Sequence, residues 1–426
     1  MLLALLTVLQ LGMAQDTLPR VTLNEALERA SRLDPNYVEA LGSVSTAEWG
    51  RRAATLAFII PAVNLQLDYT KYSTGFFNIG TLQQSSTSSN FSASASYELF
   101  SMRKFSELGR SRAALEGAEA DGLQARFTAA LLTESNYYDV LANQELNRLA
   151  IERQRRAQEA FGVARARVLS GAAVQTDSLQ LMLELTGAQV DLLRQRSALR
   201  VAQLQLGRRI GIAGAVDATP LDTAAARDLP IELAPAIQLA LEQGPQFRAA
   251  RANERAAEAL LRGRRGEYFP TFSVNATHQR FDTEVFPNAF AVSSVQFVVS
   301  LPLWDNAQRE IRITQARVSR DVSRAIRADL ERSAHVDVTA AFEAYQTARA
   351  TVELGQTAVQ VARENYRVQD ARYRAGASQI LDLLSAQLGL TTAESNLVQA
   401  RFSLRLALAG LEAIIGRRLV EDRVLP

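Results

Sequence analysis

Four stretches of the chain alternate strictly between apolar and polar residues, which is the pattern of a β-strand whose two faces meet different surroundings. In the first stretch Val63, Leu65 and Leu67 alternate with Asn64 and Gln66. The pattern predicts strands at 61–72, 90–100, 270–281 and 291–301. The strands form two pairs, joined by loops at 72–89, which is rich in Ser, Thr, Gly and Asn, and at 282–290.

The length and the faces of these strands suggest a membrane-spanning sheet. Transmembrane strands have about 9–11 residues, and the polar face here consists mainly of small uncharged side chains, as in a wet lumen. Tyr69, Phe91 and Tyr97 lie near the ends of the apolar face, where interfacial aromatic residues are found. The alternative is a soluble hairpin with one face packed on a core. Four strands cannot close a barrel in lipid, so a membrane sheet requires several chains to share one barrel.

The regions after each strand pair have a helical period, with apolar residues three and four positions apart, as at Leu381, Leu384 and Leu388. Roughly 70 helical residues span on the order of 100 Å. The pattern predicts antiparallel, coiled-coil-like packing, with helices at 102–169, 172–210, 304–374 and 377–415. A solid bundle is the alternative, although Thr391 and Ser395 interrupt the apolar seam.

The chain is internally duplicated, since residues n and n + 205 are identical at many positions without a gap. Each half also has short helices that end before a proline, at Pro35 and Pro245. The repeats are assigned to 20–211 and 231–416, with a linker at 212–230 and a tail at 417–426. Identical pairs include Ala157/Ala362, Arg167/Arg372, Gly171/Gly376, Asp177/Asp382 and Gly211/Gly416.

Composition removes several classes of function. The 426 residues include no cysteine and only two histidines, His278 and His335, which argues against disulfides, thiolate sites and histidine metal clusters. The net charge is +2, and arginines alternate with Glu and Asp, unlike the basic surface of a nucleic-acid-binding protein. No nucleotide-binding, hydrolase or metalloprotease motif occurs. We therefore expect no enzyme activity, no cofactor and no metal site.

The first residues are apolar up to Met13 and are followed by Ala14, which predicts a signal peptide at 1–14. No later apolar run reaches the length of about 18 residues that a membrane helix needs. The chain is thus predicted to be exported without being anchored by membrane helices.

Taken together, these features resemble the TolC-like outer-membrane efflux family. The resemblance rests on RYRAGASQILDLLSAQ (372–387) and its looser copy at 167–182, on the duplication, and on ELFS (98–101) and PLWD (302–305) at the strand-to-helix junctions. It covers residues 20–416 and implies a mixed α/β membrane protein. Three chains would share a 12-stranded outer-membrane barrel, and their long helices would form a periplasmic α-helical barrel.

The resemblance also implies the partners and the function. The homotrimer would sit in outer-membrane lipid as the exit duct of a tripartite efflux or type I secretion system. Its periplasmic tip would dock an adaptor protein attached to an inner-membrane pump. The alternative is a periplasmic or soluble coiled-coil rod, which membrane fractionation distinguishes from the channel.

In that family the hairpin turns form the periplasmic tip, where carboxylates and a tyrosine narrow the channel. The matching residues are Asp177, Tyr373 and Asp382, with a possible Tyr373–Asp177 hydrogen bond between hairpins. Ser378 and Ser385 stand where the family has an arginine and a second carboxylate. The alternative role for both aspartates is stabilisation of a helix N-terminus. The turns and the adaptor-docking residues would be Ser170, Gly171, Ala172, Ala375, Gly376, Ala377 and Ser378.

Overall fold

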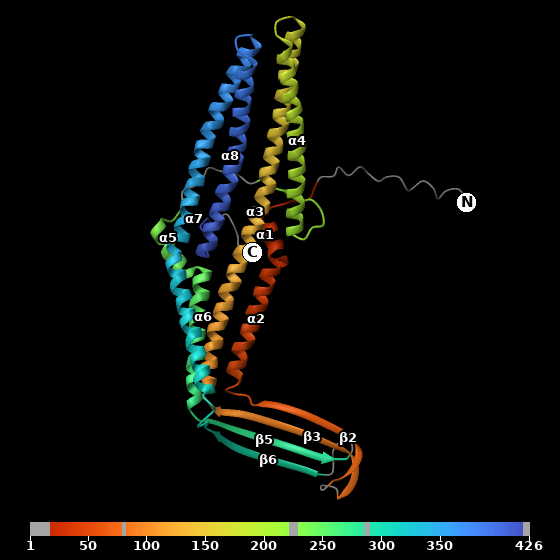
Figure 1. The fold of residues 1–426 in the computed structure, drawn as a ribbon, viewed down its shortest axis with the longest axis vertical. Coiled ribbons are helices and arrows are strands. Elements are labelled where there is room, and N and C mark those ends of the chain that lie inside the picture. Colours follow the sequence, from red (N-terminus) through yellow and green to blue (C-terminus); the bar gives the residue numbers. More distant parts are fainter. Residues whose placement is uncertain (1–17, 79–81, 221–228, 284, 286–289, 421–426) are drawn as a thin grey trace, which may run out of the picture. The chain divides into compact units, whose positions relative to one another are not determined.

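The structure, a computed structural model, describes residues 18–78, 82–220, 229–283, 285 and 290–420 (Figure 1). The predicted signal peptide at 1–14 lies outside the described residues, as do 221–228 of the predicted linker and 421–426 of the predicted tail. None of the described helices contains a stretch long and apolar enough to cross a membrane.

The same series of elements occurs twice along the chain: two short helices, two strands and two long helices. The first series is α1 (Leu23–Leu33), α2 (Pro35–Leu56), β2 (Ala62–Asn78), β3 (Gln83–Phe100), α3 (Met102–Leu169) and α4 (Gln175–Arg209). The second is α5 (Leu233–Gln243), α6 (Pro245–Arg265), β5 (Thr271–Asp282), β6 (Phe290–Ser300), α7 (Gln308–Arg374) and α8 (Ile380–Ile415). A short 3-10 helix, η1 (Gly266–Tyr268), follows α6. The long helices match closely in length, with 68 and 67 residues in α3 and α7, so the duplication extends to the structure.

Helix boundaries follow local backbone chemistry. The return helices α4 and α8 begin later than the expected 172 and 377, because Val174 and Gln379, directly before them, have an extended backbone. Helix α7 also begins later than expected, again because of the backbone conformation directly before it. α7 begins at Gln308 rather than at 304, because Asn306 and Ala307 have positive φ angles of 55° and 60°, which a right-handed helix cannot contain.

The strands β2 and β3 are longer than expected. Residues assigned to a loop at 72–89 continue the ladder, for example with Phe76 opposite Ser85 and Phe77 opposite Gln84. A register irregularity between Lys71 and Phe76 separates this outer part from the regular part. The expectation failed because main-chain pairing continues through Ser- and Thr-rich sequence that no longer alternates.

The four strands form one antiparallel sheet in the order β2-β3-β5-β6 (Figure 1). Its register places like residues opposite one another on each face. One row across the sheet is apolar throughout, namely Val63, Ala95, Ala276 and Val295. The adjacent row, on the other face, is polar throughout, namely Asn64, Ser94, Thr277 and Ser294. A slip of one residue would exchange the faces, so the alternation fixes the register.

A second, parallel pairing was not expected from the sequence. β1 (Arg20–Val21) pairs with β4 (Asp217–Ala218), and Tyr137 of α3 lies beneath the pair with no exposed surface. The Tyr137 hydroxyl donates to the carbonyl of Thr219 (2.7 Å) and is 3.2 Å from that of Val21. Burial, with smaller opposing contributions from hydrogen bonding, raises the pKa of Tyr137 to about 12. Two-residue strands carry no detectable alternation, which explains why the sequence did not reveal them.

The chain divides into two compact units, and each unit contains parts of both repeats. One comprises Met1–Ala40, Leu123–Pro245 and Ser333–Pro426; the other comprises Leu41–Gly122 and Gln246–Arg332. The sheet belongs to the second unit, and both hairpin turns belong to the first. The repeats are therefore units of sequence, whereas packing combines corresponding parts of the two.

Candidate functional site at the hairpin turns

The two hairpin turns have the same backbone geometry. Gly171 and Gly376 both have φ of 77°, a left-handed conformation that glycine adopts without the strain of a side chain. In each turn the amide three residues after the end of the helix reaches back to a carbonyl in its last turn: Ala172 N donates to Arg167 O, and Ala377 N to Arg372 O, both at 2.8 Å. These bonds satisfy carbonyls that a helix end leaves unpaired, and they reverse the chain.

Asp177 and Asp382 occupy equivalent positions in the first turn of the return helices α4 and α8. Their backbone amides donate hydrogen bonds to the carbonyls of Val174 (3.1 Å) and Gln379 (3.2 Å), the residues that precede the two helices. The side chains of Val174 and Gln379 do not cap these helices. A carboxylate at this position interacts favourably with the positive end of the helix dipole. The geometry thus fits the helix-stabilising role of both aspartates, and it leaves their side chains available for other contacts.

Tyr373 is buried among residues of four helices, with 2% of its surface exposed. Burial, followed by the negative charge of Asp177, raises the pKa of Tyr373, while Arg167 opposes the shift. The Tyr373 hydroxyl nevertheless has no hydrogen-bond partner within the described chain. The charge of Asp177 therefore acts on Tyr373, but the Tyr373–Asp177 hydrogen bond is not formed within the described chain. Asp382 is exposed, and its side chain forms no hydrogen bond or ion pair with any described residue.

Arg167, at the end of α3, links the two hairpins. Its Nη1 donates to the carbonyl of Tyr373 at 2.5 Å, and its Nη2 lies 3.4 Å from the carbonyl of Ala172. The guanidinium also lies 5.1 Å from the centre of the Tyr373 ring. Position 378 thus carries a serine instead of an arginine, but the turns contain another arginine, Arg167. The half-buried Ser378 hydroxyl has no hydrogen-bond partner in the described structure.

The sequence did not single out Arg167 as a site residue. The duplication pairs it with Arg372, but the side chain of Arg372 is exposed and forms no hydrogen bond or ion pair with the described part of the chain. Sequence identity between the repeats therefore marked both arginines equally. Only the packing of one hairpin on the other distinguishes them.

An apolar cluster behind Arg167 closes the hairpins against each other. It contains Ala160 and Ala164 of α3, Leu181 of α4, Tyr373 of α7, and Ile380 and Leu383 of α8. The small alanines allow α3 to approach the tyrosine ring closely. The structure thus brings the turn of one repeat together with that of the other.

Ion pairs join the long helices farther from the turns, both between the two hairpins and within one hairpin. Glu394 of α8 is 8% exposed at its side chain and lies 3.5 Å from Arg156 of α3 and 3.3 Å from Arg363 of α7. Arg153 of α3 contacts Glu184 (2.9 Å) and Asp191 (2.5 Å) of α4. Among the described residues, no group of three or more acidic or histidine side chains is placed to hold a metal ion.

Comparisons with known proteins agree with this architecture. The family model described as outer membrane efflux protein matches residues 23–211 and 236–417, which covers both repeats. The probable efflux pump outer membrane protein TtgC of Pseudomonas putida is 23% identical over 339 residues, covering 76% of this chain and 69% of TtgC.

Solved structures show the same fold at low identity. The outer-membrane channel OprN is similar with a TM-score of 0.77 and 19% identity, covering 92% of this chain and 89% of OprN. The open-state channel MtrE of Neisseria gonorrhoeae is similar with a TM-score of 0.76 and 19% identity, covering 94% and 90% of the two chains.

Proposed function

The chain belongs to the outer membrane efflux protein family, and on this premise we propose that it is the exit duct of a tripartite efflux or type I secretion system. The family match across both repeats is the observation that carries the proposal. Substrate would pass from an inner-membrane pump and a periplasmic adaptor to the outside, and no bond would be made or broken. The protein resides in the outer membrane and extends into the periplasm.

The sheet supports assembly into a trimer. Among the described residues, its outer strands β2 and β6 each have only one neighbouring strand, and unpaired strand edges are not tolerated in lipid. Apolar side chains on them are well exposed, for example Leu65 (71%) and Phe297 (76%). Pairing of β2 with β6 of the next copy would complete the hydrogen bonds, and three copies of four strands would give the twelve-stranded barrel.

The hairpin turns supply the constriction and the docking surface in this proposal. Asp177, Tyr373 and Asp382 would narrow the periplasmic end of the duct, with Arg167 holding the two hairpins of one chain together. The exposed turn residues Gly171 and Gly376, with their neighbours Ser170, Ala172, Ala375, Ala377 and Ser378, would contact the adaptor.

Two measurements test the proposal. Fractionation of cells should place the protein in the outer membrane as a heat-modifiable trimer; full extraction without detergent would instead indicate a rod. In planar bilayers, the double variant Asp177→Ala, Asp382→Ala should raise single-channel conductance, because it removes two of the proposed constricting side chains. Unchanged conductance would leave the aspartates with their helix-stabilising role alone.

A further inference from the structure

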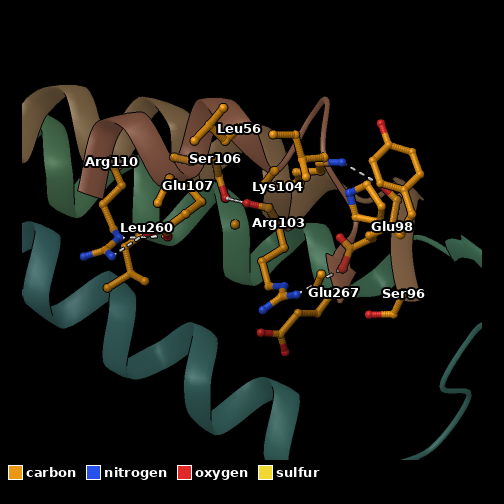
Figure 2. Close-up of a pocket in the computed structure, with 18 of the residues that line it drawn as sticks. Leu56, Ser96, Glu98, Arg103, Lys104, Ser106, Glu107, Arg110, Leu260 and Glu267 are labelled. Carbon is orange, nitrogen blue, oxygen red and sulfur yellow. Dashed lines mark hydrogen bonds and ion pairs between the residues drawn. The ribbon is translucent and has the colours of Figure 1, made fainter. Parts of the chain in front are cut away.

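A cavity of about 900 Å³ lies where the sheet meets the helices, entirely within the second compact unit (Figure 2). Its walls come from the end of α2, the end of β3, the start of α3 and the end of α6. The apolar part of the lining consists of Ala53, Ala54, Leu56, Ala57, Ile60 and Leu260. The cavity has a volume typical of sites for small organic molecules, which span about 300–1,000 Å³.

Part of the cavity lining belongs to the polar face of the sheet. Ser96 and Glu98 of β3 line it, and residues opposite each other across a sheet share a face. Ser96 is opposite Ala62 and Asn275, and Glu98 is opposite Ser273. These residues belong to the face that carries Asn64 and Ser94, and not to the exposed apolar face. A molecule in the cavity would therefore contact the aqueous side of the sheet.

Charges around the cavity do not balance. Three carboxylates line it, and each has an arginine: Arg103–Glu98 at 3.1 Å, Arg110–Glu107 at 2.5 Å and Arg264–Glu267 at 2.8 Å. Figure 2 shows the Arg110–Glu107 pair at one end and Lys104 with Glu98 at the other. Lys104 is the fourth cation and has no carboxylate partner among the described residues, so the lining carries one excess positive charge.

Lys104 is held in place by groups that leave its charge intact. Its Nζ donates to the backbone carbonyl of Glu98 at 2.6 Å and lies 4.6 Å and 4.7 Å from the ring centres of Tyr97 and Phe58. The Tyr97 hydroxyl is fixed in turn by the carbonyl of Phe58, at 2.6 Å. Ring faces attract an ammonium group without neutralising it, and the half-buried site weakens competition from water.

We propose that this cavity binds an amphipathic organic anion, that is, a carboxylate, sulfonate or sulfate with a compact hydrophobic body. The body would pack on the wall formed by Ala53, Ala57 and Leu260, and the acid group would lie near Lys104 and Arg103. The interpretation of this anion as a transported substrate rests on the proposed function. The binding itself rests only on the shape and charge of the cavity.

Lysine chemistry offers a selective test, because Lys71 and Lys104 are the only lysines in the sequence. The full-length trimer, in nanodiscs of zwitterionic phospholipid, would be reductively methylated with ¹³C-formaldehyde, which retains the lysine charge. The variants Lys71→Gln and Lys104→Gln assign the two side-chain NMR signals. Naphthalene-2-sulfonate should shift the NMR signal of Lys104 saturably. It should not shift the signal of Lys71, because Lys71 lies on β2 and does not line the cavity.

The matching cation, 2-naphthylmethylammonium, serves as the control probe and should cause a much smaller shift. Equal shifts with both probes, joint movement of both lysine signals, or no saturable shift would overturn the proposal. In unmethylated protein, Lys104→Gln should weaken naphthalenesulfonate binding about tenfold, the loss expected for one charge-assisted contact, while Lys71→Gln should have no effect.

A variant of the wall separates cavity binding from general attraction to positive charge. Ala54→Phe adds a ring where the hydrophobic body would lie and should abolish saturable binding while the trimer remains intact by size-exclusion chromatography. Should Ala54→Phe disturb assembly, the lysine variants still decide the question. Absence of a trimer or of outer-membrane localisation in the unmodified protein would contradict the proposed function. Failure of naphthalenesulfonate to bind an intact trimer would contradict only the anion site.

Discussion

Replacing Arg167 with alanine should loosen the contact between the two hairpin turns. The side chain makes the 2.5 Å hydrogen bond to the carbonyl of Tyr373, a weaker contact with the carbonyl of Ala172, and a cation–π contact with the Tyr373 ring. The apolar cluster behind it is untouched by the substitution. The hairpins should therefore still pack, but with a smaller free-energy difference between the closed and the separated arrangement.

The magnitude follows from these contacts. A hydrogen bond from a charged donor contributes about 1.5–3 kcal/mol, and a cation–π contact at an exposed site contributes about 0.5–1 kcal/mol. Arg167 is half-buried, so the lower ends apply, and their sum is about 2 kcal/mol. Since 1.4 kcal/mol corresponds to a factor of ten, the ratio of separated to closed hairpins should rise about thirtyfold.

Single-channel recording in planar bilayers measures this change as the fraction of time spent at high conductance. Arg372→Ala is the matched control, because Arg372 occupies the corresponding position of the second repeat and its side chain is exposed, with no hydrogen bond or ion pair to the described residues. We expect a large increase for Arg167→Ala and none for Arg372→Ala. Equal effects of the two variants, or an unchanged opening fraction for Arg167→Ala, would refute the assignment of Arg167 as the link between the hairpins.

Two further predictions concern stability. Tyr137→Phe should lower the free energy of unfolding by about 1–3 kcal/mol, because it leaves the partly buried carbonyl of Thr219 without its 2.7 Å donor; thermal unfolding of the trimer measures this, and an unchanged midpoint would contradict it. Near the sheet, burial alone would raise the pKa of Glu267, but hydrogen bonds from Arg264 and Arg312 outweigh it and lower the pKa below 4.5. A carboxyl with a lowered folded-state pKa contributes stability above its unfolded pKa and loses it as the pH falls through the folded value. Melting temperature should therefore fall less between pH 6 and pH 3 in Glu267→Gln than in the unmodified protein, and parallel curves would count against this role.

Much of the fold could be predicted because its signals are local and strong. Strict alternation located the strands, and the helical period located α3, whose expected bounds of 102–169 coincide with Met102–Leu169. The outer parts of β2 and β3 were missed, since Ser- and Thr-rich residues pair through the main chain without alternating. Element starts were least certain where the backbone has an unusual conformation, as at Asn306.

The candidate site was predicted less completely. The spacing of Asp177 and Asp382 from their turn glycines identified two equivalent positions, and both aspartates do lie in the first turn of a return helix. Their surroundings differ, however, because only Asp177 influences Tyr373. Arg167 was not selected, since its role depends on the carbonyl of a residue 206 positions away.

The sequence by itself determined the duplication, the two faces of the strands and the glycine turns, because each depends on residue periodicity or on backbone freedom within a short segment. Only the tertiary structure decided which copy of a repeated residue makes contacts that its counterpart in the other repeat does not make. Arg167 and Arg372 are identical by repeat, yet within the described part of the chain the packing of one hairpin on the other gives a side-chain partner to Arg167 and none to Arg372. The same holds for Lys104, which is held by the rings of Tyr97 and Phe58, while the carboxylates that β3, α3 and η1 contribute to the cavity are each paired with an arginine.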